Sequence, residues 1–313
     1  EGTYVAGTER ALGVVMENVD ITSTSTYQWC LVATQALGQF DIEMTNVDVD
    51  WNDQKNTQAA RAFLRCGNGT NTQTVNFTAT RSTIDVSETT QTQAMYICSN
   101  VKNSTFNLID TDILVPVKAL KTYTNGGTTT TINLDEDCTI TRAYKVSTGT
   151  EFTTALKENE NANASTEDVL IKLAANIQVT NKKITINNVN GKNVTIDGAN
   201  GDERYTLTLN EPNAHAILVH QASGVVTMQN LRLIHVEDGQ SMLMRIGEGD
   251  KYDHPKNVTV KLQNMSIESN SLYSYCLMAT QDSNTENGKF DIDMENVIEA
   301  DNMRFVMVNL GIV

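Results

Sequence analysis

The fold is decided by Val14–Ile21, with the sequence VVMENVDI, in which apolar and polar residues alternate on both sides of Asn18. This alternation predicts two short strands that each bury one face. The template apolar-x-apolar-x-Asn-apolar-x-apolar recurs along the chain, with neighbouring copies roughly 28 to 35 residues apart. Its further copies are Ile42–Val49, Val226–Leu233, Val260–Ile267 and Ile292–Val297, with looser ones at Phe106–Asp110, Ile132–Leu134 and Ile184–Val189.

The asparagine at the centre of the template predicts a bend. Asparagine tolerates left-handed backbone angles, so the chain can turn sharply there and the next strand can face the same interior. A third apolar run, such as Ile217–Val219 or Met242–Met244, then completes the turn. Three short strands in about 30 residues make one coil of a solenoid. The sequence therefore predicts an all-β fold, a right-handed parallel β-helix.

Stacked coils give these asparagines a second role. Equivalent side chains of successive coils lie about 4.8 Å apart, so their amides can hydrogen-bond along the stack. We therefore expect a structural ladder, and the alternative is that the asparagines only occupy turns. The expected ladder residues are Asn18, Asn46, Asn188, Asn230, Asn264 and Asn296.

A longer repeat contains the shorter one. Tyr27–Gln35 (YQWCLVATQ) reappears as Tyr273–Gln281 (YSYCLMATQ), and six of these nine positions are identical. The flanking templates match as well, so the repeat is roughly 250 residues long. The chain thus holds one large repeat and the opening part of the next.

The sequence pattern changes near residue 144. Thr150 is a suitable N-cap, and Phe152, Ala155 and Leu156 form one face of a short helix that continues to about Asn161. Such a helix can cover the open end of a β-helix. We therefore expect residues 1–143 to be the C-terminal part of one β-helix repeat unit. Residues 144–313 are expected to form a capping helix and the N-terminal part of the next unit.

Three segments after this junction carry a family resemblance: Lys145–Leu156 (KVSTGTEFTTAL), Val169–Ile177 (VLIKLAANI) and Lys192–Gly198 (KNVTIDG). Together they resemble the opening of the pectate-lyase-like adhesive domains of large microbial surface proteins. The resemblance covers residues 145–310 and, through the internal repeat, the first 60. It implies a multi-domain adhesin or stalk at the cell surface.

The chain is acidic, with a formal net charge of −15. A phosphate backbone would meet net repulsion, so a nucleic-acid partner is not expected. The sequence lacks a run of the roughly 20 apolar residues that cross a bilayer, so membrane insertion of this segment is not expected. Because it begins at Glu1 with no leader pattern, we interpret it as a mature or excerpted segment.

Two weak sites remain as candidates. Asp48, Asp50 and Asn52 alternate oxygen ligands as a calcium loop does, but the glycine and the distal glutamate of such loops are missing. Calcium is the one cofactor considered, and otherwise none is expected. Cys66 and Cys98 follow similar apolar runs in neighbouring coils, so they are candidates for a disulfide, with buried thiols as the default.

Parallel β-helices also carry polysaccharide lyases and hydrolases, which need clustered carboxylates and bases. Asp197, Asp202 and the pair Asp291 and Asp293 are candidates, but 38 acidic residues produce such pairs by chance. His220 with His235 forms an equally weak candidate for a metal pair. We therefore expect no catalytic residues and no enzymatic activity.

The expected function is that of an extracellular structural or adhesive module at the cell surface, acting as a rod-like stalk or adhesin. Its expected partners are other copies of the same repeat, stacked end to end, and host or cell-surface glycans or proteins. The alternatives are a self-assembling extracellular filament or sheath subunit, and a polysaccharide lyase or hydrolase on the same fold.

Overall fold

The chain forms two compact units, Glu1–Ala143 and Tyr144–Val313, in the computed structural model. The boundary falls where the sequence pattern changes. The structure describes residues 12–22, 32–34, 38–51, 64–66, 73–87, 96–99, 101–115, 122–125, 129–158, 168–186, 193–210, 215–219, 223–236, 242–246, 257–269, 277–280, 289–299 and 308–310.

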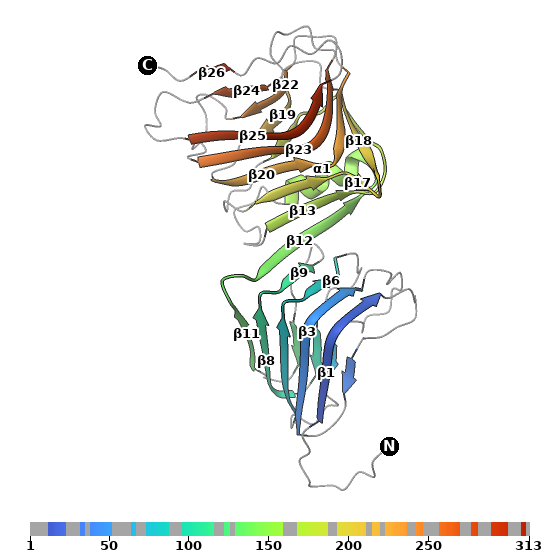
Figure 1. Cartoon of the computed structure of the whole chain (residues 1–313), viewed down its shortest axis with the longest axis vertical. Coiled ribbons are helices and arrows are strands. Elements are labelled where there is room, and N and C mark those ends of the chain that lie inside the picture. Colours follow the sequence, from blue (N-terminus) through green and yellow to red (C-terminus); the bar gives the residue numbers. More distant parts are fainter. Residues whose placement is uncertain are drawn as a thin grey trace. The chain divides into compact units, whose positions relative to one another are not determined.

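Unit 1 is a parallel β-helix in which each coil contributes one long, bent strand or two shorter ones to the main sheet (Figure 1). In stacking order these are β1 (Leu12–Thr22), β3 (Gln39–Asp50), β5 with β6 (Gln73–Thr80, Thr83–Asp85), β8 with β9 (Val101–Ile109, Asp112–Val115) and β11 with β12 (Thr129–Leu134, Thr139–Val146). A second parallel sheet contains β2 (Val32–Thr34), β4 (Leu64–Cys66), β7 (Tyr96–Ser99) and β10 (Thr122–Asn125).

Unit 2 repeats this architecture. Its main sheet contains β13 (Asp168–Leu173), β14 (Ile177–Thr180), β16 (Val194–Asp197), β18 (Glu203–Asn210), β20 (Ser223–Gln229), β21 (Leu231–His235), β23 (Asn257–Ser269) and β25 (Lys289–Glu299). The second sheet contains β15 (Ile184–Ile186), β19 (His215–Val219), β22 (Met242–Ile246), β24 (Leu277–Thr280) and β26 (Val308–Leu310). The predicted right-handed parallel β-helix is therefore confirmed.

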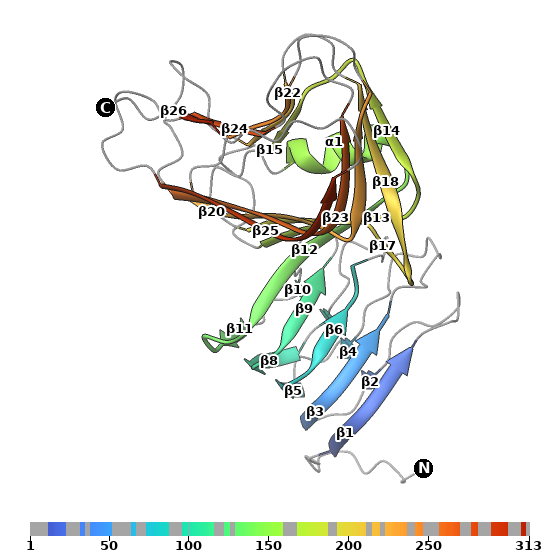
Figure 2. The ribbon, with the colours of Figure 1, turned by 45° about the horizontal axis from the view of Figure 1, so that its top comes forward.

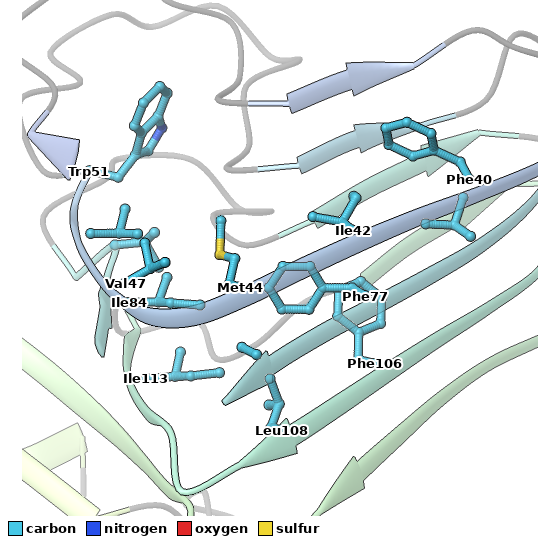
Figure 3. Packing of buried hydrophobic residues seen from close by; sticks show 14 residues of the cluster. Phe40, Ile42, Met44, Val47, Trp51, Phe77, Ile84, Phe106, Leu108 and Ile113 are labelled. Carbon is cyan, nitrogen blue, oxygen red and sulfur yellow. The ribbon is translucent and has the colours of Figure 1, made fainter. Parts of the chain in front are cut away.

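The core of unit 1 is a stack of like residues that point inward from successive coils. Phe77 and Phe106 are Cα partners on β5 and β8, and their ring centroids lie 5.5 Å apart. Both are at most 2% exposed, and Ile42 and Met44 of β3 line the same interior (Figure 3). Burial of each ring stabilises the unit by roughly 1.5–3 kcal/mol. Alternation in the sequence thus fills a narrow interior with aliphatic and aromatic side chains.

One bend of unit 2 departs from the template. Gly198 occupies the place that Asn230 holds in the next coil, and a Cβ on it would lie 2.5 Å from the Leu231 Cβ. The chain then leaves the coil in a small antiparallel hairpin of β17 (Ala199–Asn200) with the start of β18. It returns when Tyr205 donates its backbone N–H to the Gly198 carbonyl, at 2.8 Å. The hairpin is accommodated without a change in coil register.

The predicted helix is present as α1 (Gly149–Glu158), which packs beside β14 and β15 within unit 2 (Figure 2). Its predicted apolar face of Phe152, Ala155 and Leu156 is buried. The predicted N-cap at Thr150 is wrong, because α1 begins earlier. A capping box is formed instead by Thr148 and Glu151, whose side chains each bond the other's backbone N–H at 3.2 Å.

We predict that Phe77→Ala lowers the free energy of unfolding of unit 1 by about 3–5 kcal/mol, because the cavity next to Phe106 cannot be refilled by its rigid neighbours. Thr80→Ala on the outward face of the same strand is the matched control and should change stability by less than about 0.5 kcal/mol. Urea unfolding of the full chain measures both. Equal losses for the two variants would contradict the described core.

Candidate functional site

The bends between strands form a column in each unit, here called the bend column. Its residues hold positive φ angles of 45–55°, the left-handed region in which asparagine is the most tolerated residue with a side chain. The members are Asn18, Asn46, Arg81 and Asp110 in unit 1, and Asn230, Asn264 and Asn296 in unit 2. The predicted bend at the template asparagine is therefore present in every described copy of the full template.

Side-chain hydrogen bonds join the bend column of unit 1. The Asn46 Nδ2 donates to the Asn18 Oδ1 at 2.9 Å, and the Arg81 Nε donates to the Asn46 Oδ1 at 2.9 Å. One coil further along, the backbone N–H of Asp110 donates to the Asp135 carboxylate at 3.0 Å. These bonds tie the corners of β1, β3 and β5–β6 to one another, and the corner of β8–β9 to the coil that follows it, outside the apolar interior.

Unit 2 has a matching column. The Asn296 Nδ2 donates to the Asn264 Oδ1 at 3.1 Å, and the Asn264 Nδ2 to the Asn230 Oδ1 at 3.4 Å. The Asn230 Nδ2 donates in turn to the Asp197 Oδ1 at 3.2 Å. Asparagine side chains therefore bond from coil to coil as the sequence predicts, and Asp197 continues the column beyond them.

The sixth predicted ladder residue, Asn188, lies outside the described residues. The strand before it, Ile184–Ile186, pairs with β19 in the second sheet, whereas the strands before Asn230 and Asn264 belong to the main sheet. The looser template copy at Ile184–Val189 therefore begins in the second sheet and not in the main sheet. Alternation in the sequence does not distinguish these places, because it occurs in the strands of both sheets.

The long sequence repeat is also a structural repeat. β1 pairs with β3 through Met16↔Met44 and Val19↔Val47. Residues roughly 250 positions later repeat this pattern, because β23 pairs with β25 through Leu262↔Met294 and Met265↔Val297. The same asparagine hydrogen bond joins the two strands in both places.

The outward side of the unit 1 sheet carries an uncharged array, here called the Thr/Asn face. Alternate residues of β5, β8 and β11 point away from the core, and in three ranks hydroxyl and amide groups follow one another from coil to coil. The rank of Thr80 continues to the exposed Ile109 instead, and the neighbouring strand β3 borders the array with Asp41 and Glu43. Side-chain bonds fix some of the hydroxyl and amide groups, such as that from the Asn133 Nδ2 to the Asn107 Oδ1 at 2.8 Å. The face consists of Thr74, Asn76, Thr78, Thr80, Asn103, Thr105, Asn107, Thr131 and Asn133.

The calcium candidates lie on a strand rather than in a loop. Asp48 and Asp50 point to solvent from β3, between the buried residues Val47, Val49 and Trp51. Asn52 lies outside the described residues. Among the residues that are described, no three His, Cys, Asp or Glu side chains gather as a metal site would require. Calcium at this position stays a prediction, now on two exposed carboxylates of one strand.

The cysteine candidates are neighbours in the second sheet of unit 1. Cys66 of β4 and Cys98 of β7 are Cα partners in a parallel pair, as their matching sequence positions predict. The described residues do not include their side chains, so the disulfide stays a prediction.

The described acidic candidates for catalysis, Asp197 and Asp202, have different surroundings. Asp197 accepts hydrogen bonds from the Ala199 backbone N–H at 2.9 Å and the Gln229 Nε2 at 2.9 Å, besides that from Asn230. Asp202 is exposed at the tip of the β17–β18 hairpin. His235, predicted as one half of a weak metal pair, is fully buried, because it alternates with Leu231 and Leu233 on the inward face of β21. His220 lies outside the described residues.

Sequence reasoning missed a small polar cluster that closes the last coil of unit 1. The Asp135 carboxylate accepts the backbone N–H groups of Asp110 and Asp137, and the nearby Cys138 thiol is half-buried. The thiol hydrogen bond lowers the pKa of Asp135. Burial, followed by this same hydrogen bond, raises the pKa of Cys138.

Comparisons with known proteins give no match: no family model, no curated protein and no solved structure is significantly similar to the chain. Among the residues that the structure describes, there is no helix of the length and apolarity that a bilayer crossing needs.

We predict that Asn264→Ala destabilises unit 2 by about 2–4 kcal/mol, because it loses two amide hydrogen bonds and places an alanine at a φ of 50°. Asn264→Gly loses the same bonds without the backbone strain, so its loss should be smaller by roughly 1–2 kcal/mol. Urea unfolding separates the two contributions. Identical losses would mean that the left-handed backbone contributes nothing.

We predict that Asp135→Asn speeds the alkylation of Cys138 by iodoacetamide at fixed pH. The substitution removes the negative charge of the acceptor, which raises the thiol pKa, so more thiolate forms. Peptide mapping by mass spectrometry follows Cys138 separately from the other cysteines. Asp137→Asn removes an equal charge and is the control, and a larger effect from it would contradict the assigned contact.

Proposed function

We propose that the chain is an extracellular structural and adhesive module, serving as a stalk or adhesin of a tandem-repeat protein at the cell surface. The recurrence of the coil pair β1–β3 as β23–β25 carries this proposal, because both pairs share one register and one asparagine bond. Coils that repeat in this way extend a solenoid without any new architecture. Further copies of the repeat are accordingly among the proposed partners.

The proposed family is that of the pectate-lyase-like adhesive domains. Support comes from the resemblance of Lys145–Leu156 and from the position of the helix it contains, beside β14 and β15 of the first coil of a β-helix. Membership of this family and a cell-surface location are part of the proposal.

The Thr/Asn face is the proposed contact surface for adhesion. The chain has 23 basic and 38 acidic residues, yet the nine side chains of this face carry no charge. Hydroxyl and amide groups match the donors and acceptors of neutral glycans. Neighbouring bonded side chains are already ordered, which reduces the entropy lost on binding.

A binding assay tests this function. We predict that the full chain adheres to immobilised neutral polysaccharide, and that Thr105→Glu at the centre of the face abolishes adhesion because the carboxylate must be desolvated. Thr227→Glu, at an outward position of β20 in unit 2, is the matched control and should adhere as before.

Adhesion that survives Thr105→Glu would exclude this face, and absence of adhesion to neutral glycans and to cell surfaces would overturn the adhesive role. Depolymerisation of a polyuronate by the purified chain would assign it to the enzymes of this fold instead.

A filament subunit is the second candidate, in which apolar residues of β1 and β25 would contact the neighbouring subunit. Val19 of β1 is 38% exposed, whereas its partner Val47 in the next coil is fully buried. Met294 of β25 is 41% exposed, whereas its partner Leu262 is fully buried. Strands of this kind can pair with another chain.

Analytical ultracentrifugation and electron microscopy distinguish these candidates. A stalk or adhesin module should sediment as a single species, whereas a filament subunit should form polymers that Val19→Lys prevents. Polymers that persist in Val19→Lys would show that this edge is not the contact.

A further inference from the structure

Unit 2 contains a cavity of about 190 Å³ between α1 and the turn from β14 to β15. The helix contributes Thr153, Leu156 and Lys157, which lie on one face because they are three and four residues apart. The turn contributes Lys182 and Lys183. Three lysines thus line one cavity of a chain whose net charge is −15.

The local backbone explains why the lysines meet there. Asn181 holds a φ of 53°, and its backbone N–H donates to the Asn210 carbonyl at 2.7 Å. This bend turns the chain from the main sheet toward β15, so the two lysines that follow it border the cavity together with the last turn of α1. Glu151 is at the other end of α1, where it bonds the Ser147 and Thr148 backbone N–H groups.

We propose that this cavity binds the anionic group of a small ligand, the carboxylate or sulfate of an acidic sugar. Three lysines line this cavity of about 190 Å³, and ammonium groups recognise carboxylate and sulfate oxygens through charge-assisted hydrogen bonds. Thr185 also lines the cavity, and a threonine hydroxyl can bond the hydroxyl groups of a sugar ring. The Thr/Asn face of unit 1 has no part in this site, so the proposal is independent of the adhesive function.

Calorimetric titration of the full chain tests the site, with galacturonate, glucose 6-sulfate, inorganic sulfate and glucose as separate probes. We expect the charged sugars to bind and glucose not to bind. If inorganic sulfate binds as tightly as glucose 6-sulfate, the anionic group accounts for the whole affinity. That result would overturn the assignment of the ligand as a sugar. Binding of glucose equal to that of the charged sugars would overturn the proposal.

Variants locate the binding. The double substitution Lys182→Gln and Lys183→Gln should weaken binding of the charged sugar about tenfold, as expected for two partly exposed charge contacts. Lys261→Gln, on the outward side of β23, removes one positive charge elsewhere in unit 2 and should leave the affinity unchanged. Far-UV circular dichroism confirms that each variant is folded. Equal affinities of the double variant and the native chain, or no binding of any charged probe, would overturn the site.

Discussion

At each bend between two strands of the main sheet, one residue must hold a left-handed backbone while its neighbours continue a parallel ladder. A bend of this kind makes the second strand face the same interior as the first, and it repeats at the same corner of successive coils. Asparagine satisfies both demands on that corner, because it tolerates the backbone angles and because its amide can donate to one coil and accept from another. The register of both sheets and the stack of core residues depend on this arrangement.

The bend column also separates two kinds of surface. Inside the corner, like residues stack in a dry interior, as Phe77 and Phe106 do. Outside it, ranks of polar side chains repeat with the spacing of the coils, and their composition is free to differ between units. The outward positions of β5, β8 and β11 in unit 1 carry threonine and asparagine, whereas those of β3 carry Asp41 and Glu43 and one on β23 of unit 2 carries Lys261. The function of such a fold therefore depends on which side chains occupy its outward positions.

The sequence predicted the parts of the fold that depend on periodicity. Alternation and the central asparagine were sufficient for the coils and the bends. Arg81 could not be recognised as a bend residue, because arginine lacks the left-handed preference of asparagine and only its spacing places it in the column. Asp110, by contrast, stands at the asparagine position of the looser copy Phe106–Asp110. The burial of His235 could have been predicted, since it continues the inward alternation of Leu231 and Leu233. The cavity beside α1 could not, because it joins residues of a helix and a turn whose packing no local pattern encodes.

The hairpin between Gly198 and Tyr205 shows what a corner can absorb. The chain departs from the coil and re-enters it at almost the same point, so the strands before and after keep their partners in the adjoining coil. A corner with this property is a place where evolution or protein engineering can graft a new loop, because the cost of closing a short excursion is confined to the excursion itself. Diversity of binding segments can then accumulate on the outside of a solenoid whose interior stays the same.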